Sequence, residues 1–232
     1  MSERYLINGW TIDSIKGDFS IVAKDCDILV CPGDDPDNHV SKLIAEESAK
    51  NKIELPSVLL FLMGENGARV GDAYLVDSLE NKFCDSKFPK IESIIYTFGP
   101  RAMDNDYRKT QKETHLNMLK KINLAGVPQS KIGMPLISAV GDYEQPARTA
   151  TDLAEMLLKE KAADNGRTLI ICTNRGRDFN TLNAKLKEAS IEFQNKLKEE
   201  YAKEIKLSEE TNKKLRELQE QLGKHGMVFH SN

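Results

Sequence analysis

The segment from residue 131 to residue 180 most restricts the possible folds, because strand and helix signals alternate within it. An apolar run at 132–137 leads through a loop containing Gly141 to a helix expected near Pro146. Proline suits the first turn of a helix, where its missing N–H would have no partner. A glycine-containing loop before a helix also presents backbone N–H groups to an anion. The segment therefore predicts an α/β unit whose loop is either an anion-binding loop or a plain connector.

The same alternation extends over most of the chain. We expect strands at 10–15, 27–31, 57–63, 73–76, 93–97, 132–137 and 169–173, and helices at 38–50, 106–125, 145–163 and 179–189. The run at 58–63 fits a strand or a helix by periodicity alone. Strands that alternate with helices predict a layered α/β fold.

The composition changes after residue 190. An apolar row, Phe193, Leu197, Tyr201 and Ile205, continues as Leu215, Leu218 and Leu222 among charged residues. The row predicts one long helix, or a helical hairpin in which Ser208 caps a second helix, packed along the domain. The alternative is a coiled-coil dimer, although the sequence contains fewer than three clean heptads. We expect domains at 1–190 and 191–232 and favour a monomer.

Charge and cysteine usage exclude several classes of protein. The chain has 33 Lys and Arg against 36 Asp and Glu, a formal net charge of -3, so binding to nucleic acid is not expected. No apolar run approaches the roughly 20 residues of a membrane span, and no signal-peptide pattern is present. The four cysteines show no CxxC spacing, which favours reduced thiols in the cytoplasm over disulfides or a zinc site. We expect no metal and no cofactor.

Five segments occur in the order found in one known family. They are IDSIKGDF (12–19), DCDILVCP (25–32), IESIIYTFGP (91–100), KIGMPLIS (131–138) and TLIICTNRGRDF (168–179). With these segments the chain resembles the macrodomains, which are ADP-ribose-binding α/β modules. The resemblance implies a three-layer α/β/α sandwich with a central mixed sheet, here followed by a C-terminal helical extension.

The resemblance also implies a set of ligand-binding residues. In the family, an Asp after Gly at the end of the first strand accepts a hydrogen bond from the adenine amino group, and Asp18 matches it. A turn or cap is the alternative role for Asp18, and a core anchor is the alternative for Phe179. The implied ligand-binding residues are Asp18, Phe19, Cys31, Gly33, Ser138, Val140, Gly141, Asp142, Tyr143, Asn174 and Phe179.

The loop after the second buried strand departs from the family. Many macrodomains carry Asn-Ala-Ala-Asn and a run of glycines there, whereas this chain has CPGDDPDN at 31–38. Asp34, Asp35 and Asp37 follow a strand whose carboxyl end should face a ligand. Carboxylates suit ribose hydroxyls and, still better, a guanidinium. A solvent-exposed turn is the alternative.

These observations predict an ADP-ribosylhydrolase that removes ADP-ribose from modified protein side chains, with the arginine linkage favoured and Asp34, Asp35 and Asp37 as catalytic residues. His39 and Glu144 are weaker candidates for proton transfer. The alternatives are a non-catalytic ADP-ribose-binding module and an interaction protein that works through its C-terminal helices. The expected partner is ADP-ribose or an ADP-ribosylated protein, with no nucleic acid and no membrane. The acidic tail is similar to those of bacterial effectors, which would place the protein in a host cytosol.

Overall fold

The computed structural model describes residues 1–33, 39–101, 104–137, 144–159 and 166–224. The chain divides into two compact units, Met1–Ser190 and Ile191–Asn232. Within the described residues, no helix has the length and the apolar composition needed to cross a membrane.

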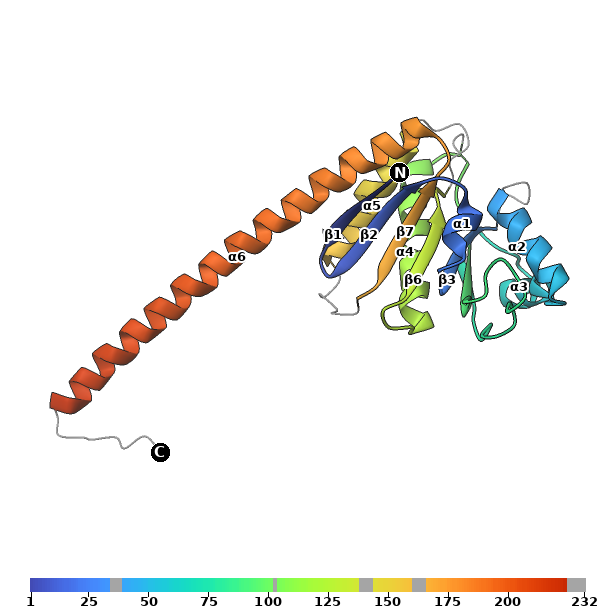
Figure 1. The fold of residues 1–232 in the computed structure, drawn as a ribbon. Helices are drawn as coiled ribbons and strands as arrows, with labels where there is room; N and C mark the ends of the chain where they lie inside the picture. The colour runs from blue at the N-terminus through green and yellow to red at the C-terminus, as the bar shows by residue number, and fades with distance from the viewer. Residues whose placement is uncertain (34–38, 102–103, 138–143, 160–165, 225–232) are drawn as a thin grey trace. The chain divides into compact units, whose positions relative to one another are not determined.

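A mixed sheet forms the centre of the first unit (Figure 1). Its strands are β1 (Ser2–Ile7), β2 (Trp10–Lys16), β3 (Ile28–Pro32), β4 (Ala73–Val76), β5 (Ser93–Thr97), β6 (Lys131–Pro135) and β7 (Thr168–Thr173). They lie in the order β1-β2-β7-β6-β3-β5-β4. The five inner strands are parallel, and the edge strands β1 and β4 are antiparallel to their neighbours. The carboxyl ends of the inner strands therefore meet at one edge of the sheet.

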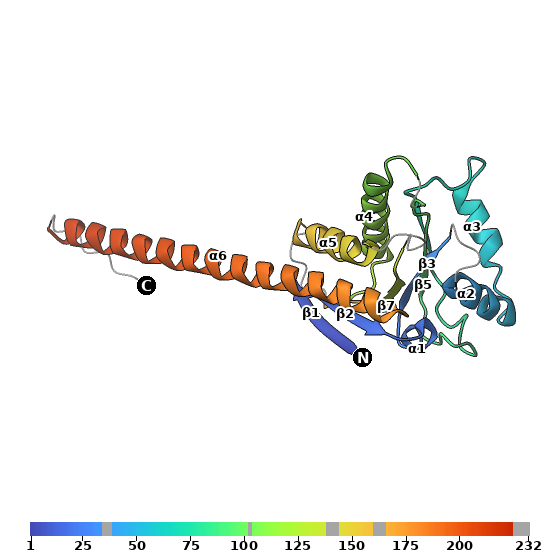
Figure 2. The same cartoon turned by 90° about the horizontal axis from the view of Figure 1, so that it is seen from above.

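Helices cover both faces of the sheet, and Figure 2 separates the two groups. The helices are α1 (Phe19–Ala23), α2 (His39–Lys50), α3 (Leu55–Met63), α4 (Tyr107–Ala125), α5 (Gln145–Lys159) and α6 (Gly176–Lys224). Apolar residues of α4, α5 and the beginning of α6 share one core with the sheet. Residues of α1 and α2, with Leu55 of α3, share the other. The expected three-layer α/β/α sandwich with a mixed central sheet is confirmed.

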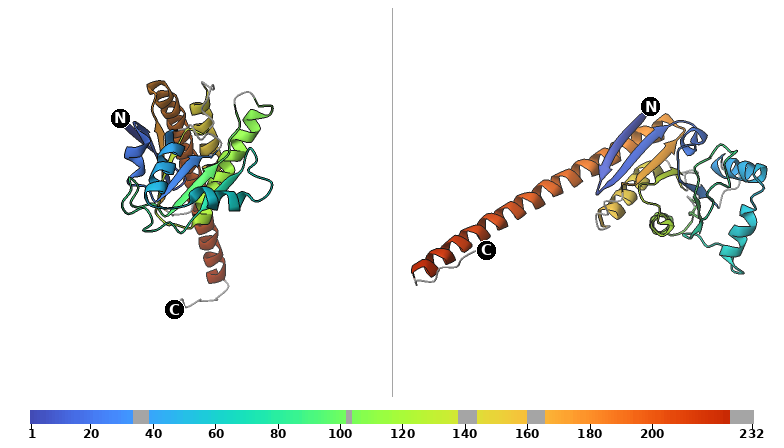
Figure 3. Two further views of the ribbon diagram at one scale, coloured as in Figure 1. Left: turned by 90° about the vertical axis from the view of Figure 1, so that its right-hand side faces the viewer. Right: turned by 60° about the horizontal axis from the view of Figure 1, so that its bottom comes forward.

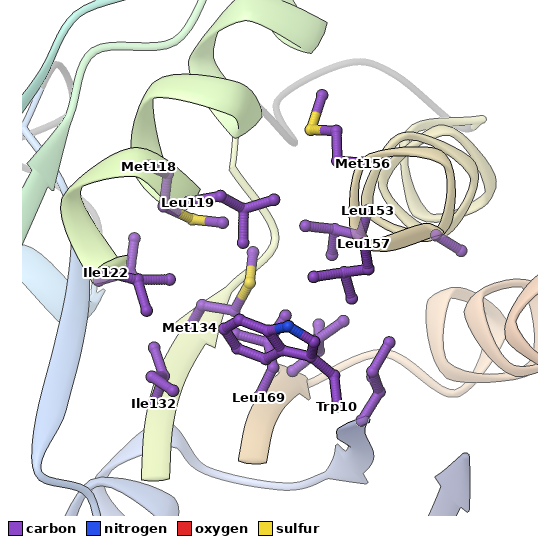
Figure 4. Close-up of a cluster of buried hydrophobic side chains, with 14 of the residues drawn as sticks. Trp10, Met118, Leu119, Ile122, Ile132, Met134, Leu153, Met156, Leu157 and Leu169 are labelled. Atoms are coloured by element: carbon purple, nitrogen blue, oxygen red, sulfur yellow. The ribbon is translucent and has the colours of Figure 1, made fainter. Parts of the chain in front are cut away.

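The larger core is built around Trp10, the only tryptophan of the chain. Its side chain is 1% exposed and lies among Met134, Leu153, Leu157 and Leu169 in Figure 4. Strands β2, β6 and β7 contribute to this cluster together with α4 and α5. Trp10 therefore links the sheet to the helices on that face.

The expected strand at 57–63 is wrong, because the segment forms helix α3. Pro56 occupies the first turn of this helix, and the N–H of Gly64 closes the last turn on Leu60 O at 3.1 Å. The free edge of β5 is already occupied, because β4 pairs with β5 there. As a result only Leu55 of the helix is buried, and Phe61 is 84% exposed.

The N-terminal hairpin of β1 and β2 was not expected, and the right panel of Figure 3 shows it in blue. Asn8 and Gly9 connect the two strands with φ values of 48° and 79°. A two-residue hairpin turn of type I′ needs positive φ at both positions, which explains the Asn-Gly pair.

Helix α6 also corrects the expected boundaries. It begins at Gly176 rather than at 179 and continues without a break to Lys224. Ser208 lies inside the helix and caps no second one, so the helical-hairpin prediction is wrong. Helix α1 (Phe19–Ala23) was not expected. The remaining strands and helices form within a few residues of their expected positions, although residue 38 of the expected helix 38–50 and 160–163 of the expected helix 145–163 lie outside the described residues.

Candidate ligand-binding site

A cleft of about 910 Å³ opens at the carboxyl ends of β2, β6 and β7. Its size lies within the range of small-molecule sites. The lining residues are Met1, Lys16, Gly17, Asp18, Phe19, His39, Val40, Pro135, Leu136, Cys172, Thr173, Asn174, Arg175 and Asp178. They come from the ends of three strands and the beginnings of helices α1, α2 and α6, where open α/β sheets bind ligands.

Asp18 contributes the best-defined polar group of the cleft. It is the N-cap of α1, and its Oδ1 accepts a hydrogen bond from Ser20 N at 2.8 Å. This bond lowers the pKa of the Asp18 carboxyl, with a smaller contribution from His39, whose Nε2 lies 3.4 Å from the same oxygen. The side chain remains 52% exposed. Asp18 is therefore an ionised acceptor at neutral pH that caps a helix and still faces the cleft.

Apolar side chains form another part of the cleft wall. Phe19, Val40, Leu136 and Cys172 line it, and each belongs to one of the two cores or lies at its edge. A wall held by core packing keeps its shape without a ligand, and its apolar surface suits the face of a flat heterocycle. The wall and Asp18 together match a base with a polar edge.

Two cationic side chains, Lys16 and Arg175, line the cleft together with the acidic Asp18 and Asp178. Lys16 and Arg175 line the cleft and form no ion pair within the described ranges. Lys16 Nζ lies 3.1 Å from the position that a Cβ atom at Gly176 would occupy, so the ammonium group sits at the N-terminus of α6. A helix N-terminus carries a partial positive charge, which adds to that of Lys16. The positive charges of Lys16 and Arg175 therefore suit an anionic part of a ligand.

The fold was compared with known proteins. No family model matches the sequence, and no curated protein matches it either. Among solved structures, a variant of the Oceanobacillus iheyensis macrodomain with ADPR is 18% identical at a TM-score of 0.62, covering 81% of this chain and 98% of that one. The Trypanosoma brucei macrodomain in complex with ADP-ribose is 14% identical at a TM-score of 0.51, covering 75% of this chain and 68% of that one. The chain has the macrodomain fold.

The cleft brings together part of the predicted site. Asp18, Phe19 and Asn174 all line it. Cys31 is buried, with its Sγ 3.6 Å from Ser41 Oγ, and Gly33 packs against Phe98 so closely that a Cβ atom would lie 2.7 Å from Cζ. Phe179 is 1% exposed and belongs to the core, as in its alternative role. These last three do not line the cleft.

The remaining predicted site residues lie outside the described part of the chain. These are Asp34, Asp35 and Asp37 of the acidic loop, and Ser138, Val140, Gly141, Asp142 and Tyr143 of the expected pyrophosphate loop. Gly33, the residue before the acidic loop, belongs to the described part of the chain. Gly33 N donates to Thr97 O at 2.7 Å, which holds the start of the acidic loop beside β5.

The residues expected at the site did not include Lys16, Thr173, Arg175 or Asp178, and His39 was only a weaker candidate. Their signal is position, since Lys16 and Thr173 end adjacent strands and His39 begins a helix after a strand. Thr173 Oγ1 is buried and has no hydrogen-bond partner among the described residues. A polar group left unpaired in this way costs about 1–3 kcal/mol, which a water or ligand hydroxyl could offset.

The described residues indicate neither a metal site nor a reactive cysteine in the cleft. They contain no group of three or more His, Cys, Asp or Glu side chains suited to a metal ion. All four cysteines are free. Burial raises the pKa of the Cys172 thiol to about 11, with a further contribution from the charge of Asp18. Cys172 is therefore a protonated, weakly nucleophilic wall residue at neutral pH.

We expect iodoacetamide to label Cys84 in the native protein much faster than Cys172. Cys84 is exposed, whereas Cys172 is buried and its thiol is protonated. Peptide mapping by mass spectrometry after a time course would give both rates, and the buried Cys26, with its pKa raised to about 12, serves as an internal control. Labelling of Cys172 at the rate of Cys84 would show that its thiolate is accessible.

Proposed function

We propose that the protein binds ADP-ribose, with the adenosine end in the cleft that Asp18 lines. The observation that carries the proposal is the position of Asp18, half exposed beside an apolar wall at the carboxyl edge of a macrodomain sheet. Structures with the same fold hold ADPR and ADP-ribose, which supports this choice of ligand.

Each part of the ligand has a chemical counterpart among the described residues. The ionised carboxylate of Asp18 can accept a hydrogen bond from the adenine amino group. Phe19, Val40 and Leu136 offer apolar surface to the ring. Lys16 and Arg175 provide positive charge toward the phosphates. The arrangement therefore fits a ligand with a base at one end and anionic groups beyond it.

We expect Asp18→Ala to weaken ADP-ribose binding by about 1–3 kcal/mol, because a hydrogen bond to a charged acceptor is lost. Isothermal titration calorimetry gives the dissociation constant, and circular dichroism checks the fold. The alanine variant also removes the cap of α1, which Asp18 makes with Ser20 N. Asp18→Asn keeps a capping oxygen and serves as the matched variant.

A ligand lacking the amino group separates base recognition from helix capping. The wild type should prefer ADP-ribose over the analogue that carries hypoxanthine in place of adenine. Asp18→Ala should bind the two ligands equally, because the group that distinguishes them is gone. Equal preference in the wild type would remove Asp18 from the adenine site, and no binding of ADP-ribose at all would overturn the proposed function.

We further propose hydrolysis of ADP-ribose from modified arginine, carried out by the acidic loop. Two described features support this. The loop follows Gly33 at the carboxyl end of β3, and the chain after it returns to the cleft wall at His39 and Val40. A loop attached at these points begins and ends beside the ligand edge of the sheet.

The chemistry of the loop suits this reaction. Cleavage of the N-glycosidic bond passes through an oxocarbenium-like state at the ribose. One carboxylate would hold ribose hydroxyls and orient a water, and another would pair with the departing guanidinium. The alternative is an ADP-ribose-binding module without turnover, which the sequence Cys31-Pro32-Gly33-Asp34 favours because the asparagines of the family are missing.

A further inference from the structure

The part of α6 that belongs to the second unit exposes its apolar side chains. From Ile191 the helix continues to Lys224, and Tyr201, Ile205, Leu207, Leu215 and Leu218 are all more than half exposed. Most helices in proteins owe their stability to an apolar face buried in tertiary contacts, because helix propensity alone is marginal. This segment therefore needs a partner, and its charges indicate which one.

One row of side chains on this helix has an unusual order of charges. Its members recur every three or four residues and therefore share a face: Lys196, Glu200, Lys203, Leu207, Glu210, Lys214 and Glu217. Read outward from Leu207, the two halves mirror each other with opposite signs. Glu200 and Lys214 are both seven residues from Leu207, while Lys203 and Glu210 differ by one residue in their distance from it.

If two copies of this helix pair antiparallel about a two-fold axis, residues of opposite charge in the row lie opposite each other. The two-fold axis places residues equally far before and after it opposite each other, and it brings the same side of both helices together. With Leu207 at the axis, Glu200 meets Lys214 of the second copy, and Lys203 meets Glu210 of that copy. Every charge of the row then faces its opposite, which fixes orientation and register.

The neighbouring seam supplies apolar contact for the same arrangement. Positions one residue further along from the row are Leu197, Tyr201, Glu204, Ser208, Thr211, Leu215 and Leu218. Antiparallel pairing in this register places Leu197 within two residues of the level of Leu215 of the second copy, and Tyr201 within two residues of the level of its Thr211. Ile205 and Leu207 lie near the axis and approach their own copies. In a parallel pair, by contrast, Glu200 would lie opposite Ile205 and gain no charge partner.

We propose that residues 191–224 pair with the same segment of a second copy as an antiparallel two-helix coiled coil centred on Leu207. The partner is identified by charge complementarity along one row and by exposed apolar residues beside it. The pairing of the helices does not depend on the ligand of the cleft. Either the pairing or the proposed function can therefore fail while the other holds.

Charge reversal in the full-length protein tests the register. The wild type should form dimers in sedimentation equilibrium at low ionic strength. Glu200→Lys and Lys214→Glu should each weaken the dimer by about tenfold or more, because each creates two like-charge contacts. The double variant should restore the wild-type dissociation constant. Residues 200 and 214 lie about 21 Å apart along one helix, so only contact between copies explains the rescue.

Glu220→Lys is the matched control, because Glu220 lies off the row and reversal there should leave the dimer unchanged. ADP-ribose binding should be equal in all variants, since the cleft is built by residues up to Asp178. A wild type that stays monomeric at about 100 μM would overturn the proposal. A double variant no tighter than the single ones would overturn the antiparallel register.

Discussion

Trp10→Ala is expected to lower the free energy of unfolding by about 3–5 kcal/mol, the usual cost of removing a large buried aromatic side chain. Trp10 is 1% exposed and belongs to the core shared by the sheet, α4 and α5. Its loss leaves a cavity that surrounding side chains from both layers cannot fill without moving. Urea denaturation followed by circular dichroism measures the change.

Two controls belong to this experiment. Trp10→Phe keeps an aromatic ring and should cost clearly less than the alanine variant. Leu60→Ala removes an apolar side chain that is 64% exposed, so it should change stability by no more than about 0.5 kcal/mol. An equal effect of Trp10→Ala and Leu60→Ala would contradict the central place of Trp10 in the core.

Among the variants Asp34→Ala, Asp35→Ala and Asp37→Ala, at least one should lower release of ADP-ribose from a modified arginine by about 10²-fold or more. That range is typical for loss of a positioned acid or base. Binding of free ADP-ribose should fall much less, because the proposed adenosine contacts are at Asp18 and the cleft wall beside it. The assay measures ADP-ribose released from an arginine-modified protein, alongside calorimetry with free ADP-ribose.

Asp85→Ala supplies the matched control, since Asp85 is exposed and does not line the cleft. Full turnover in all three loop variants would remove the loop from catalysis. A wild type that binds ADP-ribose but releases none from arginine, serine or glutamate linkages would identify a binding module. This second outcome contradicts hydrolysis and leaves the proposed binding intact.

Strands β3, β5 and β7 could be predicted because their sequences are nearly continuous apolar runs with clear ends. In β3 and β5 every residue is buried, as expected for parallel strands covered on both faces. The edge hairpin was missed, although the Asn8-Gly9 pair is a strong hairpin signal. Its first strand has mostly exposed side chains, so the apolar pattern is weak there.

For helix α3 the local sequence pattern could not decide between a strand and a helix. Its run of apolar residues fits a buried strand, yet most of its side chains are exposed. Whether the segment joins the sheet depends on pairing available elsewhere, and β4 already occupies the neighbouring edge. Pro56 and Gly64 mark the beginning and end of the helix, and only these residues carried the correct signal.

The sequence by itself determined the layered fold and the strand ends where a site could form, because both follow from the periodicity of apolar residues and the loops between them. Only the tertiary structure decided which of these ends meet. Strands β2 and β7 lie side by side, and Cys172 Sγ donates to Gly17 O at 3.3 Å across 155 residues of chain. Sheet order brings Lys16, Asp18 and Arg175 to one cleft, because strand neighbours are chosen by packing over the whole core rather than by nearness in sequence.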